Sequence, residues 1–186
     1  MNRRSIVKWL AAAPLAGVAG PWFARPASAK GEKAVEELQK NWKSLLADGA
    51  DVAGSAEPLK LSRDEWKKRL APEAFEVLRK EGTERAGSSP LDREKRPGVF
   101  VCAGCGLPLF TSEMKFDSGT GWPSFFTIIP GAIGTSRDFK LIYPRTEYHC
   151  ARCGGHQGHL FDDGPEPTGQ RYCNNGVALR FIPKTC

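Results

Sequence analysis

The chain has 186 residues and a formal net charge of +6 at neutral pH, and its length fits one domain with extensions. Four of the 27 basic residues and no acidic residue precede residue 30, which leaves 23 basic against 21 acidic residues. This balance excludes the strongly basic surface of a nucleic-acid-binding protein. The 20 glycines and 14 prolines, with few helical patterns after residue 80, favour a strand-rich domain with many turns.

Residues 1–29 have the pattern of a twin-arginine-type signal peptide. Arg3 and Arg4 open it, an apolar stretch follows over residues 9–19, and residues 27–29 form an Ala-x-Ala cleavage site. An uncleaved membrane anchor is the alternative, but the apolar run is far shorter than the ~20 residues of a membrane-spanning helix. We therefore expect export to the periplasm and no membrane attachment after cleavage.

Residues 30–58 predict an N-terminal helix and a linker. Apolar residues recur at helical spacing over residues 32–47, and Asp48-Gly49 ends the run. A helix docked on the domain is the simpler interpretation, and a partner-binding helix is the other. The remaining residues, 59–186, form the predicted main domain.

Two short helices should open that domain. Ser62 and Glu65 have the spacing of a capping box, in which each residue satisfies a backbone N–H of the other. Pro72 suits the first turn of a second helix, which should end near Lys80.

Short apolar segments between Gly/Pro turns then predict a series of strands. They cover residues 99–101, 107–110, 125–129, 140–143, 159–161 and 177–182. The expected fold is mainly β, with two antiparallel sheets.

Two matching Cys-x-x-Cys pairs, each followed by glycine, predict a metal site. Its ligands would be Cys102, Cys105, Cys150 and Cys153. Four thiolates complete the tetrahedral shell of a structural zinc ion and leave no open position for water. Two disulfides, or a redox-active Cys-x-x-Cys, are the alternatives in an oxidising compartment.

The segment from Arg171 to Phe181 has the character of a strand. On a strand, Arg171, Cys173 and Asn175 would share one face. A nearby cation stabilises a thiolate, which is the reactive form of cysteine. The alternative is a buried structural cysteine beside a surface arginine.

Two further segments offer partners for such a thiol. His156 and His159 follow the second cysteine pair on a tight turn and could donate a proton or stabilise a thiolate, unless they are additional metal ligands or face solvent. Trp122 follows a Gly-Thr-Gly turn, and its ring could hold a thioether or sulfoxide group or be part of the core.

Taken together, these segments resemble the methionine-R-sulfoxide reductases, the B type of peptide methionine sulfoxide reductase, from about Leu61 to Pro183. The resemblance rests on motifs in the family's order, at residues 102–105, 121–125, 150–153, 155–165 and 171–175. It implies two antiparallel sheets packed around a core, like a sandwich or barrel, with a few N-terminal helices and a zinc ion that clips two turns together.

The resemblance also implies roles for individual residues. Cys173 would be the nucleophile, with Arg171 near its thiolate. His156, His159 and Asn175 would surround the sulfoxide, while Trp122 and Phe125 of the same motif would line the substrate pocket. The attack would leave a sulfenic acid on Cys173, which a second thiol must reduce.

The chain departs from part of the family at Thr120, where many members carry a resolving cysteine. Cys186 is the only cysteine outside the predicted zinc site and the nucleophile. Either Cys186 resolves the sulfenic acid through a C-terminal tail, or an external thiol attacks it; a thioredoxin-like protein is the family's usual donor. We favour the external thiol.

The expected substrates are oxidised proteins and peptides, and the expected oligomeric state is a monomer. Two rival functions remain. A non-catalytic zinc-stapled binding module would have no need of Cys173, the two histidines or Asn175. A disulfide oxidoreductase would require a Cys-x-x-Cys between a strand and a helix, a context that this sequence lacks.

Overall fold

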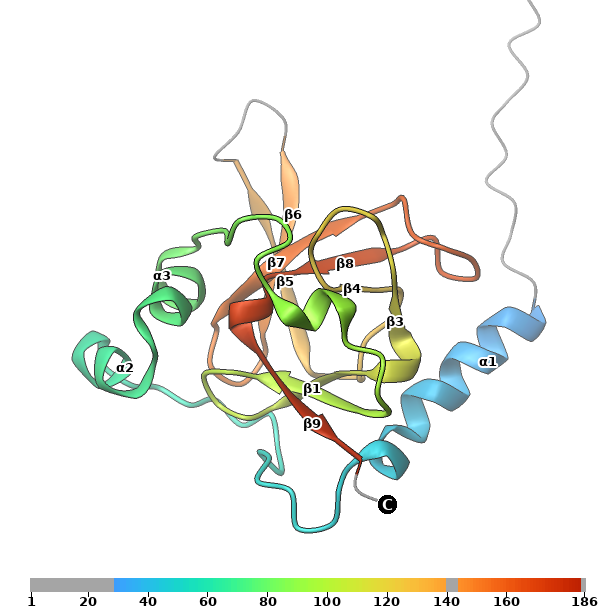
Figure 1. Ribbon diagram of the computed structural model, residues 1–186, viewed down its shortest axis with the longest axis horizontal. Helices are drawn as coiled ribbons and strands as arrows, with labels where there is room; N and C mark the ends of the chain where they lie inside the picture. Colours follow the sequence, from blue (N-terminus) through green and yellow to red (C-terminus); the bar gives the residue numbers. More distant parts are fainter. Residues whose placement is uncertain (1–28, 140–143, 185–186) are drawn as a thin grey trace, which may run out of the picture.

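The computed structural model describes residues 29–139 and 144–184 (Figure 1). The predicted signal peptide up to residue 28, the strand predicted at residues 140–143 and Cys186 lie outside these ranges. None of the helices within them has the length and apolar character needed to cross a membrane.

The N-terminal helical region consists of α1 (Ala29–Lys40) and a 3-10 turn, η1 (Trp42–Leu45). The single helix expected over residues 32–47 therefore breaks at Asn41. The amide of Gln39 donates to the Thr127 hydroxyl at 2.8 Å, and Leu45 is buried. The hydrogen bond from α1 and the burial of Leu45 on η1 both agree with a helical region docked on the domain.

The next two helices, α2 (Arg63–Arg69) and α3 (Pro72–Lys80), match the prediction. Ser62 N–H donates to the Glu65 carboxylate at 2.7 Å, and Glu65 N–H donates to the Ser62 hydroxyl at 3.3 Å, so the capping box forms. Glu81, with φ 56°, ends α3 in the left-handed region. α3 packs against the strand β7 (His156–Phe161) and the 3-10 turn η4 (Gly176–Ala178), which lie at the candidate site.

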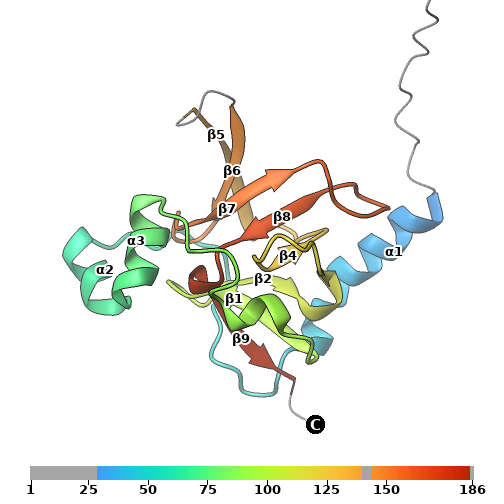
Figure 2. The same cartoon turned by 45° about the horizontal axis from the view of Figure 1, so that its top comes forward.

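Two antiparallel sheets form the body of the molecule, as predicted. The three-stranded sheet has the order β2-β1-β9, and the six-stranded sheet has the order β3-β4-β8-β7-β6-β5. The strands are β1 (Gly98–Cys102), β2 (Pro108–Thr111), β3 (Lys115–Phe116), β4 (Ser124–Phe125), β5 (Ile133–Asp138), β6 (Arg145–Cys150), β7 (His156–Phe161), β8 (Arg171–Asn174) and β9 (Leu179–Pro183). Short 3-10 turns connect some of them: η2 (Pro90–Arg93), η3 (Ser112–Met114) and η4 (Gly176–Ala178). Figure 2 shows the β5–β6 hairpin extending beyond the rest of its sheet.

An aromatic core joins the two sheets. Phe110 of the three-stranded sheet stacks on Phe125 of the six-stranded sheet, with ring centroids 4.0 Å apart and ring planes 7° from parallel. Phe100 meets Phe125 edge-on at 5.0 Å. All three rings have no exposed surface, and burial of this kind stabilises the fold by roughly 25 cal/mol per Å² of apolar area.

The prediction of one strand from Arg171 to Phe181 is wrong. β8 ends at Asn174 and pairs within the six-stranded sheet, whereas β9 begins at Leu179 and pairs with β1 in the other sheet. The turn between them is held by Glu84, whose carboxylate accepts N–H groups from Gly176 at 2.6 Å and Val177 at 3.0 Å. The strand expected over residues 125–129 is also shorter, because only Ser124–Phe125 pair within the sheet.

Candidate active site and metal centre

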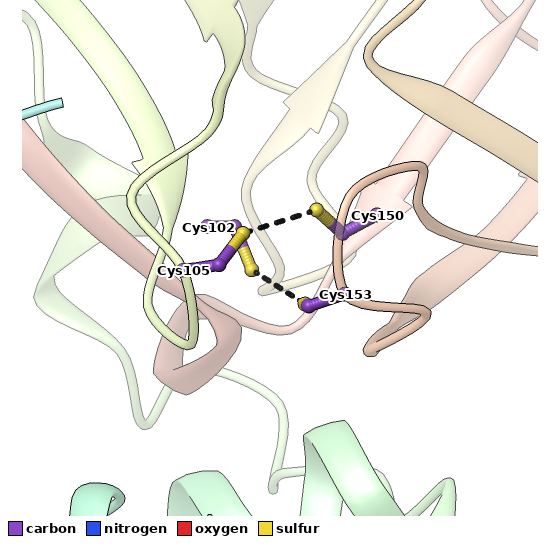
Figure 3. A group of neighbouring side chains, drawn as sticks. All are labelled: Cys102, Cys105, Cys150 and Cys153. Atoms are coloured by element: carbon purple, nitrogen blue, oxygen red, sulfur yellow. Dashed lines mark hydrogen bonds between the residues drawn. The ribbon is translucent and has the colours of Figure 1, made fainter. Parts of the chain in front are cut away.

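Four cysteine sulfurs gather between the two sheets, as the paired motifs predict. Cys102 and Cys105 lie on the β1–β2 turn and Cys150 and Cys153 on the β6–β7 turn, with the four side chains pointing toward one another (Figure 3). All four are buried free thiols, and their ligand atoms lie within 4.8 Å of one another.

The spacing of the sulfurs fits a tetrahedral metal site. The closest pairs join the two turns: Cys102 Sγ to Cys153 Sγ at 3.7 Å, and Cys105 Sγ to Cys150 Sγ at 3.5 Å. A tetrahedral ion with metal–sulfur distances of about 2.3 Å has sulfur–sulfur edges of about 3.8 Å. A disulfide needs about 2.05 Å, so this arrangement favours the metal site over the two alternative disulfides.

Backbone hydrogen bonds shape each cysteine turn. Gly106 N–H donates to Cys102 O, and Gly154 N–H donates to Cys150 O, both at 2.8 Å. Both glycines have positive φ, 73° and 65°, which other residues rarely adopt. The glycines after each pair are therefore needed to fold the turn around a metal ion.

Three arginines bind the outer carbonyls of these turns. Arg69 donates to Gly104 O at 2.8 Å, Arg152 to Cys105 O at 2.8 Å, and Arg79 to Cys153 O at 2.9 Å. A divalent metal with four thiolates carries a net negative charge, and buried charge requires nearby compensation. These cations would supply it when a metal ion is bound, and they fix the carbonyls around the cysteines.

A separate pocket of about 120 Å³ contains Cys173. Its lining consists of Thr83, Trp122, Arg145, Gly158, His159, Phe161, Cys173, Asn174 and Asn175. Cys173 lies on β8, directly opposite His159 of β7 on one side and Ser124 of β4 on the other. A side chain at Gly158 would collide with the Cys173 carbonyl, so this glycine permits the close approach of β7 to β8.

The electrostatic environment of Cys173 combines opposing effects. Burial raises the pKa of its thiol above the ordinary value, while the charge of Arg171 and hydrogen bonds with Thr120 and Arg171 lower it. The thiol is therefore partly desolvated yet faces groups that favour its anion. This combination suits a nucleophile whose thiolate is stabilised inside a pocket.

Arg171 is held in place by two contacts. Its guanidinium donates two hydrogen bonds to the carboxylate of Asp163, at 2.7 and 2.8 Å, and lies 4.3 Å from the ring centroid of Phe161. The hydrogen bond with Asp163 is the main reason that the pKa of Arg171 is raised. The predicted cation beside Cys173 is thus present, and its geometry is fixed.

The two predicted histidines lie together, with ring centroids 5.4 Å apart. His159 Nε2 lies 2.8 Å from Asp138 Oδ2, and that carboxylate also accepts from Arg145 at 2.7 Å. Burial is the main cause of the lowered pKa of His159, which favours its neutral form near pH 7.

His156 lies deeper and is almost completely buried. Its Nδ1 is 2.7 Å from Glu147 Oε1, and its Nε2 has no hydrogen-bond partner among the described residues. The metal-ligating group found in the described part of the chain contains the four cysteines and neither histidine. His156 is not among the residues that line the pocket, and its ring packs against that of His159, which does line it.

Trp122 and Asn175 both reach the pocket and are both tied to Glu84. The indole N–H of Trp122 donates to the Glu84 carbonyl at 3.2 Å, and the Asn175 side-chain oxygen accepts from Glu84 N–H at 3.0 Å. The Asn175 amide nitrogen donates to the Gln157 carbonyl at 3.0 Å. Asn175 is therefore anchored at both ends of its side chain.

Comparison with known proteins identifies the family. Residues 70–183, more than half of the chain, match the SelR domain. The chain belongs to the methionine-R-sulfoxide reductase B family. It is 49% identical over 135 residues to peptide methionine sulfoxide reductase B1, chloroplastic, from Arabidopsis thaliana, covering 72% of this chain and 67% of that protein. It is 51% identical over 121 residues to peptide methionine sulfoxide reductase MsrB from Methanosarcina barkeri, covering 64% of this chain and 85% of that protein.

In this member of the family, one predicted substrate contact is corrected. Phe125 has no exposed surface and stacks in the core on Phe110, because its position on β4 turns its ring between the two sheets. Phe161 of β7 lines the pocket instead. Asn175 shares the pocket with Cys173 but follows β8 rather than extending its face.

Several site residues were missed at the sequence level. Arg145, Asp138 and Glu147 come from the β5–β6 hairpin, and Thr83 and Glu84 come from the loop after α3. The sheet register brings the hairpin residues to the histidines, and the loop after α3 brings Thr83 and Glu84 to the pocket and its supporting turn. Arg145 and Glu147 lie two residues apart, which is consistent with one face of a strand, but nothing local in the sequence specifies which face is functional.

Proposed function

We propose that this chain reduces methionine-R-sulfoxide, mainly in proteins and peptides, to methionine, with Cys173 as the nucleophile. The observation that carries the proposal is the position of Cys173. Within residues 29–139 and 144–184 it is the one cysteine outside the metal cluster, and it lines a pocket opposite a histidine and near an arginine.

The reaction transfers the sulfoxide oxygen to the protein thiol. The Cys173 thiolate attacks the electrophilic sulfur and forms a sulfur–sulfur bond while the sulfoxide oxygen is protonated. The oxygen then passes to the Cys173 sulfur as the substrate's sulfur–oxygen bond and the new sulfur–sulfur bond break, and methionine leaves with its sulfur reduced by two electrons. Cys173 retains the oxygen as a sulfenic acid. Two thiol equivalents then regenerate Cys173, with release of water and formation of one disulfide.

Proton delivery and charge stabilisation fall to groups around Cys173. The sulfoxide oxygen gains negative charge as the thiolate attacks, so it needs a proton or a hydrogen-bond donor. A water that His159 positions, or His159 in its protonated form, supplies the proton, and Asp138 holds the imidazole through Nε2. Trp122 and Phe161 provide apolar surface for the substrate methyl group.

The four-cysteine cluster would hold one zinc ion in a structural role. Zinc suits a tetrahedral set of four thiolates, and such a closed set leaves no position for substrate. Because the β6–β7 turn contains two of the ligands and β7 carries both histidines, the ion would fix the histidine strand against the other sheet. Zinc content of about one per chain by elemental analysis is the expected result.

We also propose how the sulfenic acid is reduced and where the enzyme acts. A thioredoxin-like or other external thiol would reduce the sulfenic acid, with Cys186 as the alternative resolving cysteine. The twin-arginine-type N-terminus supports a periplasmic location, where the enzyme would repair oxidised envelope proteins as a monomer.

Turnover of a peptide containing methionine-R-sulfoxide tests the main proposal. Wild type and Cys186→Ser should reduce the R epimer with an excess of small thiol, and neither should reduce the S epimer at a comparable rate. Cys173→Ser should lose all measurable turnover, since a hydroxyl is a far weaker nucleophile than a thiolate. Equal rates for Cys173→Ser and wild type would refute the catalytic assignment.

A further inference from the structure

The two histidine rings of the site meet although the residues are three positions apart on β7. On an uninterrupted strand, residues three apart point to opposite faces of the sheet. Between β6 and β7, however, the register shifts: Tyr148 pairs with Gly158, and His149 pairs with His156. Gln157 is therefore an extra residue that opposes no residue of β6. Such a bulge bends the strand and re-aims its side chains, and the two imidazole centroids lie 5.4 Å apart.

The β5–β6 hairpin supplies one carboxylate to each ring, and the two rings use different nitrogens. His159 Nε2 lies 2.8 Å from Asp138 Oδ2. His156 Nδ1 lies 2.7 Å from Glu147 Oε1. The two rings are thus held from the same hairpin but in opposite senses.

A second donor favours the ionised form of each carboxylate. The Arg145 guanidinium donates to Asp138 Oδ2 at 2.7 Å, and the Ser136 hydroxyl donates to Glu147 Oε2 at 3.2 Å. Hydrogen bonds to the charged form of a carboxyl group stabilise that form. An ionised carboxylate has no proton to give, so the ring nitrogen that faces it must carry the proton.

The two neutral rings are therefore opposite tautomers. A neutral imidazole has one protonated nitrogen and one bare nitrogen. His159 is protonated at Nε2 and has its lone pair at Nδ1, whereas His156 is protonated at Nδ1 and has its lone pair at Nε2. The Nε2 atom of His156 is buried and has no partner among the described residues. Buried acceptors are normally satisfied, so this one points to a donor that is not a side chain of the described chain.

We propose that Asp138 and Glu147 are positioning residues that fix these two tautomers, so that Nδ1 of His159 and Nε2 of His156 are the nitrogens available to the reaction. A water that donates one proton to His159 Nδ1 keeps its second proton for the sulfoxide oxygen. When Nδ1 instead binds a proton from solvent, Asp138 stabilises the imidazolium and Nδ1–H donates to the oxygen. In both cases the same atom of His159 faces the substrate oxygen while Nε2 stays on Asp138.

These positioning roles deepen the proposed function and rest on it, because they concern the imidazole that serves Cys173. Their main test needs no turnover, since a tautomer is read directly from the nitrogen resonances of a ring. Failure of the two roles can therefore be distinguished from failure of the proposed function, which the Cys173→Ser assay decides.

The experiment is nitrogen-15 NMR of the full, metal-loaded chain labelled at histidine, at about pH 8.5, where an ordinary imidazole is neutral. The chain has three histidines, and each is assigned from the spectrum of a variant that lacks it. Wild type should show His159 protonated at Nε2 and His156 protonated at Nδ1. A neutral His159 protonated at Nδ1, or a neutral His156 protonated at Nε2, would overturn the proposal without any variant.

Two variants then test the carboxylates one at a time. Glu147→Ala should move the His156 nitrogen resonances toward the average of the two tautomers and leave those of His159 unchanged, and Asp138→Ala should do the reverse. Asp138→Ala should also lower kcat for a sulfoxide peptide by about 10- to 100-fold, with KM changed less than about threefold, because proton delivery is lost rather than binding.

Glu113→Ala, at an exposed glutamate on η3, is the matched control and should leave both tautomers and kcat as in wild type. If Glu147→Ala keeps the His156 resonances of this control, Glu147 does not fix that ring. If Asp138→Ala keeps the His159 resonances and the kcat of the control, the positioning role of Asp138 is wrong.

Discussion

The reactivity of Cys173 depends on two charges that act in opposite directions. The nearby Arg171 guanidinium lowers the pKa of the thiol, whereas the Asp163 carboxylate that holds the arginine raises it. Burial raises the pKa further and is the largest effect. Because Arg171 partly offsets the effect of burial on the pKa, the thiol of Cys173 can be desolvated and still ionise.

The pH dependence of this thiol follows from the direction of its shift. Because the pKa is raised, Cys173 is mainly protonated near neutral pH, and its thiolate fraction grows about tenfold for each pH unit below that pKa. Alkylation of Cys173 in the Cys186→Ser background should therefore accelerate steadily from about pH 6 to about pH 8. A plateau that begins near pH 6 would contradict the raised pKa.

Substitutions of the ion pair should shift this profile in opposite directions. Arg171→Met removes the cation and should slow alkylation near neutral pH by about three- to tenfold, while Arg171→Lys should retain part of the effect. Asp163→Asn removes the opposing carboxylate and should speed alkylation. Thermal unfolding of each variant controls for lost packing of Arg171 on Phe161, and shifts of the same sign in Arg171→Met and Asp163→Asn would rule out this charge balance.

The sequence located residues whose role depends on local chemistry, and it failed where a role depends on distant partners. The four cysteines gather as their spacing predicted, and Cys173 and His159 line one pocket, as expected of a thiol and an imidazole that act together. Phe125 was misassigned because its motif does not reveal which face of β4 meets the core.

At the level of elements, the site depends on the loop after α3. Glu84 accepts two N–H groups at the start of η4 and holds Asn175 and Trp122 through its backbone. This one residue therefore connects the end of β8 to the aromatic wall of the pocket. A dense cluster of contacts between segments about 40 and 90 residues apart cannot be deduced from spacing along the chain.

Loss of the Glu84 carboxylate should disturb both stability and substrate binding. Glu84→Ala leaves two N–H groups of η4 without an acceptor, which should lower the free energy of unfolding by about 1 to 3 kcal/mol. The KM for a sulfoxide peptide should rise because the loop that carries Glu84 loses its anchor on η4, and the Glu84 backbone then holds the Trp122 indole less firmly. Urea unfolding and steady-state kinetics measure the two effects.

Glu113→Ala is the matched control, since Glu113 is an exposed glutamate on η3. It should leave both quantities unchanged. A Glu84→Ala variant with the stability and KM of this control would show that the Glu84 carboxylate does not position the pocket.

Residues 171–181 form the two strands β8 and β9, whereas the sequence pattern predicted one strand. The Asn175-Gly176 pair is a turn signal that could have placed the break. The alternation of apolar residues on both sides concealed it, because strands of two different sheets have the same period. The choice of sheet is set by pairing with β7 and β1, which lie far away in the sequence.

In the whole molecule, the metal centre and the active site share one buried network. The Gln157 amide donates to Cys102 Sγ at 3.4 Å, and its oxygen accepts from Asn174, next to Cys173, at 3.4 Å. Tyr148 donates to the Asn174 oxygen at 2.8 Å. The four-cysteine centre therefore joins the two sheets and also reaches the strands that carry Cys173 and the histidines.

Metal removal should consequently abolish activity although no metal ligand lines the pocket. Without the ion, four thiols would lie buried together and the β1–β2 and β6–β7 turns would lose their common anchor, so the melting temperature should fall by more than about 10 °C. Chelation of the full chain under reducing conditions, followed by thermal unfolding, a peptide-reduction assay and readdition of zinc, measures the loss and its recovery. Cys150→Ser should resemble the chelated protein, and Cys186→Ser should resemble wild type. A metal-free chain that keeps its melting temperature and its kcat/KM would show that the two sheets hold the site together without the clip.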